Sequence, residues 1–331
     1  MHKTIYLMSI SCVAQKRPLL SVILPTWNGA ASMRELLGVL CRQTVLFHEL
    51  LVVDSSSSDE TVEIAKEFGA EVVVIPEEEF DHGGTRTMIS KQAQGDILIF
   101  LTQDAVPIST DALVNLIQPL LSDETIAVTY GRQLPNRDAT LLAAHLRSFN
   151  YPAQAVVRSF ADRERLGFQT VFVSNSFAAY RKIALAEVDY FKSGLVFGED
   201  TCAVGRLLMR GYKVAYVSDA MVFHSHNYSC LQEFRRSFDI GVLHVTERWL
   251  LDTYGGAEGR GWQYVKSGVI HLMNVKKALL PNFFWRIFLK FLGYKLGNNF
   301  QSLPQCLIPF LSMHRSWWVS FRDASVFHKT L

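Results

Sequence analysis

The chain has 331 residues, of which 49% are hydrophobic, so it can bury a large core in one domain or in two smaller ones. Its net charge of +2 gives no strong electrostatic case for nucleic acid as the main partner. The five cysteines are odd in number and lack a C-x-x-C pair. Neither a disulfide framework nor a zinc knuckle is therefore expected, and a reducing cytoplasm fits best.

The chain offers no membrane-spanning segment, because no stretch provides the about 20 consecutive apolar residues that such a helix needs. Residues 1–17 have a basic start and a weakly apolar middle, as a signal peptide would. Ser9, Ser11 and Cys12 dilute that apolar run. We therefore interpret residues 1–17 as an N-terminal extension.

The first part of the chain alternates short apolar runs with helical patterns. Strands are predicted at 19–25, 50–53, 71–75, 97–101 and 126–130. Helical patterns separate these runs, and Ser57-x-x-Glu60 has the form of a capping box that opens one of them. Repeated β-α units of this length imply right-handed crossovers and a mostly parallel sheet. The predicted fold class is α/β.

The alternation becomes less regular after Gly131. We predict helices at 139–149 and 200–210, a strand at 168–173, and extended structure at 213–226. From about residue 231 the pattern is helical, basic and aromatic. The predicted division is an α/β domain at 18–240 and a helical C-terminal region at 241–331.

Carboxylates follow two of the predicted strands. Asp54 ends the second strand, and Asp104 follows the run at 97–101, whose unbroken apolar character predicts burial on both faces. In open α/β sheets, ligands bind at the carboxyl ends of the strands. Both residues are candidate ligand-binding groups, although either could instead cap a turn; for Asp54, Ser57 already offers a cap.

The loop from Asp81 to Arg86 combines two glycines with a histidine and an arginine at the expected start of a helix. Amides at a helix start and a guanidinium group suit a diphosphate. The alternative is a tight turn with a surface arginine.

Several sequence blocks resemble those of a known enzyme family. The blocks at 21–28, 53–61 and 198–200 (SVILPTWN, VDSSSSDET and GED) resemble the signatures of family 2 glycosyltransferases with the GT-A fold. The blocks at 80–86, 101–105, 130–133, 149–152, 174–175 and 224–226 resemble the bacterial dTDP-rhamnose-dependent rhamnosyltransferases that build O-antigen or related polysaccharides. The similarity extends from Ser21 to about Gly241.

The resemblance implies an inverting enzyme. It would move L-rhamnose from dTDP-β-L-rhamnose to a hydroxyl of a lipid-linked oligosaccharide. Two alternatives stay open: another UDP-, GDP- or dTDP-sugar as donor, and a non-catalytic subunit that binds sugar nucleotides in an assembly complex. The presence of Asp54, Arg86, Asp104 and Asp200 together argues against a non-catalytic role.

The resemblance also assigns a nucleotide-sugar site, in which Asp54 contacts the pyrimidine base. Its residues are Pro25, Thr26, Asn28, Asp54, His82, Arg86, Gln103 and Asp104. One departure from the family pattern is Thr87, where many relatives have asparagine. The family's phosphate-binding role is therefore better supported for Arg86 than for Thr87.

A divalent cation, Mg²⁺ or Mn²⁺, is expected to stabilise the departing nucleoside diphosphate. The wider family binds it with Asp-x-Asp, of which this chain keeps only Asp104. His224 and His226 are the natural further ligands, since residues i and i+2 of an extended segment face the same way. The resemblance favours His226, and structural histidines are the alternative.

The acid pair Glu199-Asp200 begins a predicted helix. The resemblance assigns Asp200 as the base that deprotonates the acceptor hydroxyl, and Glu199 as the residue that orients the acceptor or a loop. Acidic residues are also favoured in a first helical turn by the helix dipole. Sugar or acceptor binding is assigned to further polar residues, each of which could instead brace a loop: Arg132, Asn150, Tyr151 and Asn175.

The predicted helix at 279–296 has aromatic and aliphatic side chains around most of its circumference, with Arg286, Lys290 and Gly293 as a narrow polar stripe. Such a helix suits the surface of an anionic membrane, and Trp317-Trp318 between two arginines favours the same location. A core helix or a dimer contact is the alternative. The expected location is the cytoplasm, on the inner face of the cell membrane, and the sequence does not determine the oligomeric state.

Overall fold

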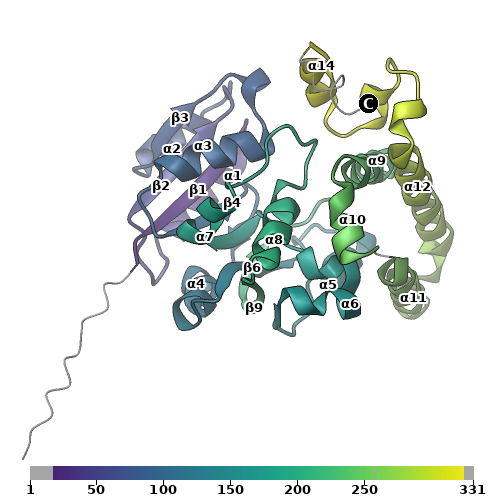
Figure 1. Cartoon of the computed structure of the whole chain (residues 1–331), viewed down its shortest axis with the longest axis horizontal. Coiled ribbons are helices and arrows are strands. Elements are labelled where there is room, and N and C mark those ends of the chain that lie inside the picture. The colour runs from purple at the N-terminus through teal and green to yellow at the C-terminus, as the bar shows by residue number, and fades with distance from the viewer. Residues whose placement is uncertain (1–17, 257, 324–331) are drawn as a thin grey trace, which may run out of the picture.

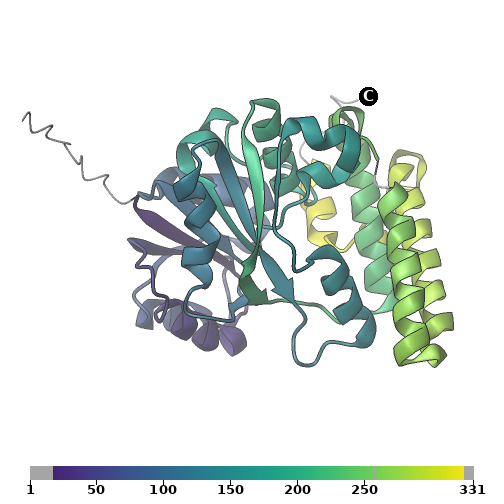
Figure 2. The ribbon, with the colours of Figure 1, turned by 90° about the horizontal axis from the view of Figure 1, so that it is seen from below.

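The protein is described by a computed structural model, which covers residues 18–256 and 258–323. The predicted extension at 1–17 lies outside the described residues. Figures 1 and 2 show a twisted sheet with helices on both faces and a separate group of helices at one side, formed by the C-terminal part of the chain.

The N-terminal half consists of β-α units, as predicted. Four parallel strands lie in the order β3-β2-β1-β4. The strands are β1 (Leu20–Thr26), β2 (Glu49–Asp54), β3 (Glu71–Val74) and β4 (Ile97–Leu101). The helices are α1 (Ala30–Leu40), α2 (Thr61–Glu67), the short 3₁₀ helix η1 (Glu77–Glu79) and α3 (His82–Gln92). All five residues of β4 are buried, which confirms the burial expected of an unbroken apolar run.

The second half completes a mixed nine-stranded sheet. Its strands are β5 (Val106–Pro107), β6 (Ile126–Leu134), β7 (Val156–Arg158), β8 (Phe177–Arg181) and β9 (Lys213–Phe223). Its helices are α4 (Ala112–Ser122), α5 (Leu141–Asn150), η2 (Phe160–Asp162), α6 (Arg163–Leu166), η3 (Gly167–Val171), α7 (Lys182–Glu187) and α8 (Glu199–Met209). β6 and β9 are parallel, whereas β8 lies between β4 and β6 and is antiparallel to both. β8 therefore joins the two halves of the sheet.

Two local predictions are wrong. The strand predicted at 168–173 is mainly the 3₁₀ helix η3, which begins where Gly167 adopts a φ of +56° and buries Thr170 and Val171. A short apolar run does not distinguish a strand from a buried helical turn. The capping box predicted at Ser57 is also absent: the N-cap of α2 is Glu60, without a side-chain hydrogen bond.

The C-terminal helices are α9 (Cys230–Thr246), α10 (Arg248–Tyr254), α11 (Glu258–Val275), η4 (Lys277–Leu279), α12 (Leu280–Asn298), η5 (Phe300–Ser302), α13 (Ile308–Leu311) and α14 (Arg315–Asp323). The predicted division at 240/241 falls inside α9. Among the described helices, none combines the length and the hydropathy needed to cross a bilayer.

Helices α9 and α12 touch backbone to backbone through glycines. A Cβ atom on Gly241 would collide with the backbone of α12 at Tyr294, and a Cβ on Gly293 or Gly297 would collide with carbonyl oxygens of α9. Only glycine allows this approach, so the α9–α12 glycine contact fixes the second helix firmly against the first.

Candidate active site

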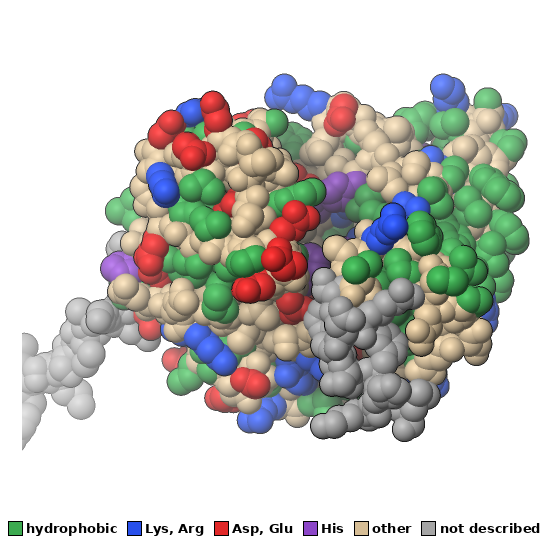
Figure 3. Space-filling view, turned by 90° about the horizontal axis from the view of Figure 1, so that it is seen from above, with side chains coloured by type: hydrophobic (Ala, Val, Ile, Leu, Met, Phe, Trp, Pro, Cys, Tyr) green, Lys and Arg blue, Asp and Glu red, His purple; other side chains and the backbone are tan. Residues whose placement is uncertain are grey.

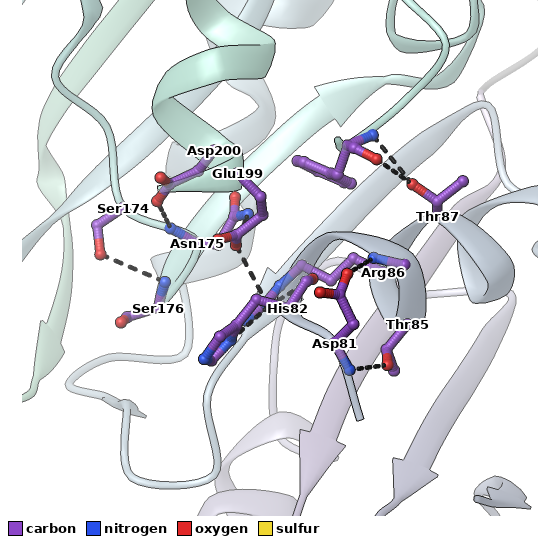
Figure 4. Close-up of polar contacts among 12 residues, drawn as sticks. Asp81, His82, Thr85, Arg86, Thr87, Ser174, Asn175, Ser176, Glu199 and Asp200 are labelled. Atoms are coloured by element: carbon purple, nitrogen blue, oxygen red, sulfur yellow. Dashed lines mark hydrogen bonds and ion pairs between the residues drawn. The ribbon is translucent and has the colours of Figure 1, made fainter. Parts of the chain in front are cut away.

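The predicted site residues gather at the carboxyl ends of β1, β2 and β4, at the starts of α3 and α8, and just after β9. Figure 4 shows the part of this site formed by α3 and α8. This is the edge of the sheet where ligands bind in α/β folds.

Asp54 is fully buried, and protein groups already satisfy its carboxylate. Thr26 Oγ1 and Ser57 Oγ donate to Asp54 Oδ2 at 2.8 and 2.6 Å, and the Ser57 amide donates to Oδ1 at 2.8 Å. The hydroxyl and the amide of Ser57 thus both donate hydrogen bonds to Asp54. Asp54 fastens the turn after β2.

The turn after β1 is held by the other residues of the predicted nucleotide site. Asn28 adopts a φ of +46°, and its Oδ1 accepts from the Ser58 amide at 2.8 Å. Gln103 accepts from the Trp27 amide at 2.9 Å and donates to the Trp27 carbonyl at 3.0 Å. Pro25 and Thr26 lie in the last part of β1. The edge thus carries a rigid turn beside an exposed Trp27 ring.

Arg86 is buried in an ion pair. Its Nη1 lies 3.3 Å from Glu199 Oε1 and donates to the His82 carbonyl at 3.0 Å, and its side chain is 6% exposed (Figure 4). The α3 N-terminus is capped by Asp81, whose Oδ1 accepts from the Gly84 amide at 2.5 Å. The alternative of a surface arginine is wrong. Arg86 faces the acid pair of α8.

The acid pair begins α8, directly after Gly198, which has a φ of +83°. The Asn175 amide donates to Asp200 Oδ2, and Asn175 Nδ2 donates to Glu199 Oε1, both at 3.2 Å. Tyr180 Oη in turn donates to Asn175 Oδ1 at 2.7 Å. Asn175, assigned from the sequence to sugar or acceptor binding, braces both acids in this structure.

The two acids have opposite pKa shifts. Burial, followed by the negative charge of Glu199, raises the pKa of Asp200 to about 7. Burial also opposes ionisation of Glu199, but the charge of Arg86 outweighs it, so the pKa of Glu199 is lowered. Burial lowers the pKa of His82 to about 4, which leaves it neutral at pH 7. A carboxyl group with this pKa can exchange a proton near neutral pH, as a general base must.

Asp104, His224 and His226 form a cluster that could hold a metal ion. One ligand atom from each lies within 4.8 Å of the others. Asp104 Oδ2 is 3.4 Å from His224 Nε2 and 3.8 Å from His226 Nε2. Burial opposes ionisation of Asp104, but hydrogen bonding and charge from His224 hold its pKa well below the usual range. An ionised carboxylate with two imidazoles suits Mn²⁺ or a related cation, so the donor set fits the predicted metal.

The remaining predicted residues brace the surroundings. Tyr151 is 3% exposed and packs its ring against Phe172 and Tyr216, and its carbonyl accepts from Arg132 Nε at 3.2 Å. Asn150 ends α5 and is partly exposed. Tyr151 and Arg132 therefore make the loop-bracing contacts that were the alternative to a role in sugar or acceptor binding.

Sequence reasoning missed residues that reach the site from elsewhere. Gln133 Oε1 contacts His224 directly, and Arg147 donates a hydrogen bond to the same oxygen. His314, between α13 and α14, places its ring edge-on to His82 with centroids 5.3 Å apart. No motif signals these contacts, because the partners are far apart in the chain.

Solved structures share this fold. A mannosyltransferase from Pyrobaculum calidifontis, solved in complex with GDP-Man and Mn²⁺, superposes with a TM-score of 0.56 at 17% identity over 95% of this chain and 89% of that one. Staphylococcus aureus TarS 1–349, solved with UDP-GlcNAc, gives 0.53 at 18% identity over 94% and 92%. The fold class is the GT-A fold of glycosyltransferases, with the predicted helical C-terminal region.

The chain belongs to glycosyl transferase family 2, whose profile matches residues 21–189. It is 41% identical over 308 residues to the O-antigen chain rhamnosyltransferase RfbN of Salmonella typhimurium, covering 92% of this chain and 98% of that protein. It is 40% identical over 310 residues to the O-antigen chain rhamnosyltransferase WbaN of Salmonella anatum, covering 93% and 98%. The predicted family and enzyme class are confirmed.

Proposed function

We propose that this enzyme transfers L-rhamnose from dTDP-β-L-rhamnose to a hydroxyl of a lipid-linked oligosaccharide in O-antigen synthesis, with inversion at the anomeric carbon. The observation that carries the proposal is the near-full-length similarity to two relatives named as O-antigen chain rhamnosyltransferases. The Asp200–Glu199–Arg86 arrangement supports the chemical part of the proposal, because it supplies a base of suitable pKa.

In this proposal Asp200 is the general base. As the acceptor oxygen forms its bond to the anomeric carbon, Asp200 takes the hydroxyl proton, and the bond from that carbon to the diphosphate oxygen breaks with its electron pair leaving on dTDP. Glu199, held ionised by Arg86, keeps Asp200 basic by charge repulsion. Asp104 and His226 would hold Mg²⁺ or Mn²⁺, which neutralises charge on the departing diphosphate.

Donor choice is the first test of this proposal. We expect turnover with dTDP-L-rhamnose and a lipid-linked acceptor to exceed turnover with dTDP-glucose, UDP-sugars and GDP-sugars by at least about 100-fold, because a site built to hydrogen-bond a sugar discriminates strongly against mismatched hydroxyls. Radiolabel transfer to extracted lipid acceptor measures this. Faster turnover of another donor would refute the rhamnosyl assignment while leaving the transferase class intact.

The C-terminal helices support a membrane-surface location, because α12 exposes its aromatic face. Arg286 and Lys290, predicted as the polar stripe, instead turn toward α9, where both lie within 3.5 Å of the Glu233 carboxylate. Aromatic side chains are left on the outside, each about half exposed: Phe284, Trp285, Phe288 and Phe291. Figure 3 shows hydrophobic side chains gathered on this side of the molecule.

The charge of this region suits an anionic lipid surface. The chain has no acidic residue between Glu258 and Asp323, whereas Lys266, Lys276, Lys277 and Lys295 are exposed there. Juxtamembrane basic residues each add about 1 kcal/mol of attraction to an anionic bilayer. These charges support the proposal that the enzyme works in the cytoplasm on the inner face of the membrane. Trp318 takes no part, since it is 3% exposed and packs in the cluster around Phe300.

A vesicle experiment tests the membrane contact. Replacing both Trp285 and Phe288 with serine should weaken co-sedimentation with phosphatidylglycerol-rich vesicles by about 10–100-fold, because full burial of such a ring contributes about 1.5–3 kcal/mol and each of these rings is already about half buried. Leu46→Ser, which changes an 87% exposed leucine of the α1–β2 connection, is the matched control and should bind as wild type does. Unchanged vesicle binding, with loss of a dimer in ultracentrifugation, would instead identify this face as a contact between copies.

A further inference from the structure

Gln133 lies between the cation-binding residues and the base-bearing part of the site. It is on β6 and is 1% exposed. Its Oε1 lies 2.9 Å from His224 Nδ1 and also accepts from Arg147 Nη1, while its Nε2 donates to Ser174 Oγ at 3.0 Å. Every polar atom of this buried amide is therefore engaged.

Arg147 determines which way the amide faces. A guanidinium group can only donate hydrogen bonds, so the atom of Gln133 that faces Arg147 must be the carbonyl oxygen. The same oxygen faces His224 Nδ1, and an oxygen acceptor requires a hydrogen on that nitrogen. Bound to a cation, His224 must then use its other nitrogen, Nε2.

His224 Nε2 points at the carboxylate that the proposed cation site uses. It is 3.4 Å from Asp104 Oδ2. With hydrogen on Nδ1, His224 Nε2 and the Asp104 carboxylate oxygen face each other across a gap that a positive species, either a proton or a metal cation, would fill. In metal sites, a hydrogen bond to the distal ring nitrogen commonly sets the tautomer of a ligand histidine.

We infer that His224 is a third ligand of the divalent cation, and that Gln133 and Arg147 are positioning residues that present its Nε2 to the ion. This inference rests on the cation site proposed at Asp104 and His226. It adds His224, whose side chain is 7% exposed, as a ligand, and it adds Gln133 of β6 and Arg147 of α5 as supporting residues.

The same amide connects the cation site to the base. Ser174, which accepts from Gln133 Nε2, immediately precedes Asn175, and Asn175 holds both Glu199 and Asp200. Loss of the Gln133 nitrogen alone, as in Gln133→Glu, breaks the link to Ser174 and keeps the oxygen that faces His224, so it should differ from loss of the whole amide.

Mn²⁺ binding without sugar transfer tests the inference. Electron paramagnetic resonance titration of the full chain should show about 10–100-fold weaker Mn²⁺ binding in Gln133→Met, since outer-sphere partners of metal ligands typically have effects of this size. Gln133→Glu keeps an acceptor for Arg147 and for His224 Nδ1, so it should bind Mn²⁺ within about threefold of wild type. Thermal unfolding and dTDP binding confirm that each variant is folded.

Nuclear magnetic resonance of ¹⁵N-histidine-labelled protein with Mg²⁺ gives a second readout. The His224 proton should be on Nδ1 in wild type and in Gln133→Glu, and that assignment should be lost in Gln133→Met. A wild-type proton on Nε2, or equal Mn²⁺ affinity in wild type and Gln133→Met, would overturn the inference and leave the site at Asp104 and His226 in place. Absence of Mn²⁺ binding to wild type would overturn both.

Discussion

Asp200→Asn should lower kcat for sugar transfer by about 10²–10⁴-fold, with little change in the affinity for dTDP-rhamnose. Asparagine preserves the size of the side chain and its oxygen acceptor for the Asn175 amide, but it cannot take a proton from the acceptor hydroxyl. Single-turnover kinetics and calorimetric donor binding separate these two effects. Asp252→Asn, a change to an exposed aspartate of α10, is the matched control.

The pH dependence of kcat is a second test of Asp200 as the general base. Because burial and Glu199 raise the pKa of Asp200 to about 7, kcat of wild type should rise with pH through about 7 and then level off. A rate that is independent of pH between 5 and 9 under chemistry-limited conditions, or an Asp200→Asn variant with near-normal kcat, would contradict the assignment of the base.

The raised pKa also predicts an effect on stability. In the unfolded chain Asp200 ionises near pH 4, whereas in the fold it ionises near 7, so the fold binds this proton more tightly. The stability that this proton contributes is fully present below pH 4 and is lost as pH rises through 7. Asp200→Asn removes the buried charge, so its melting temperature at pH 8 should exceed that of wild type by a few degrees.

Asp104→Asn should weaken Mn²⁺ binding by about 10²–10³-fold and lower kcat/KM in parallel. Asp104 is the anionic member of the Asp104–His224–His226 cluster, and an ionised carboxylate neutralises and ligates a divalent cation in a way that an amide cannot. A cation at a phosphoryl oxygen contributes several kcal/mol, and each 1.36 kcal/mol corresponds to a factor of ten.

Paramagnetic titration, with and without dTDP, measures this effect. Asp219→Asn, in an exposed part of β9, retains normal binding if the site is specific. Wild-type Mn²⁺ affinity in Asp104→Asn would remove Asp104 from the cation site. Normal turnover of wild type in chelator would remove the cation from the reaction.

Local sequence signals were sufficient for the N-terminal half of the fold. The apolar runs of β1, β2 and β4 are continuous and end at polar turns, so period and length alone identify them. β8 was missed because its inner residues are two alanines, and its place between β4 and β6 depends on pairing with distant strands. Pairing between distant segments leaves little trace in a local pattern.

Site residues that stand in a recognisable sequence motif could be predicted, whereas contacts between residues far apart in the chain could not. Asp104, His226 and the acid pair could be proposed as candidates because they stand in characteristic sequence blocks. The Arg147–Gln133–His224 chain spans three elements, and no spacing relates its members. The orientation of α12 could not be predicted either. Its polar stripe faces inward because α9 offers the Glu233 carboxylate and packs closely against α12 at glycines.

The α9–α12 glycine contact has a geometric consequence. α9 begins four residues after His226, and its backbone is locked to that of α12, which bears the exposed aromatic face. Because two helices in backbone contact cannot slide past each other freely, the aromatic face keeps a fixed position relative to the start of α9, close in the chain to His226. With the aromatic face on a bilayer, the reaction centre would stand at a constant height above the lipid. Acceptor hydroxyls at that height above the lipid would then be the ones presented to the reaction centre.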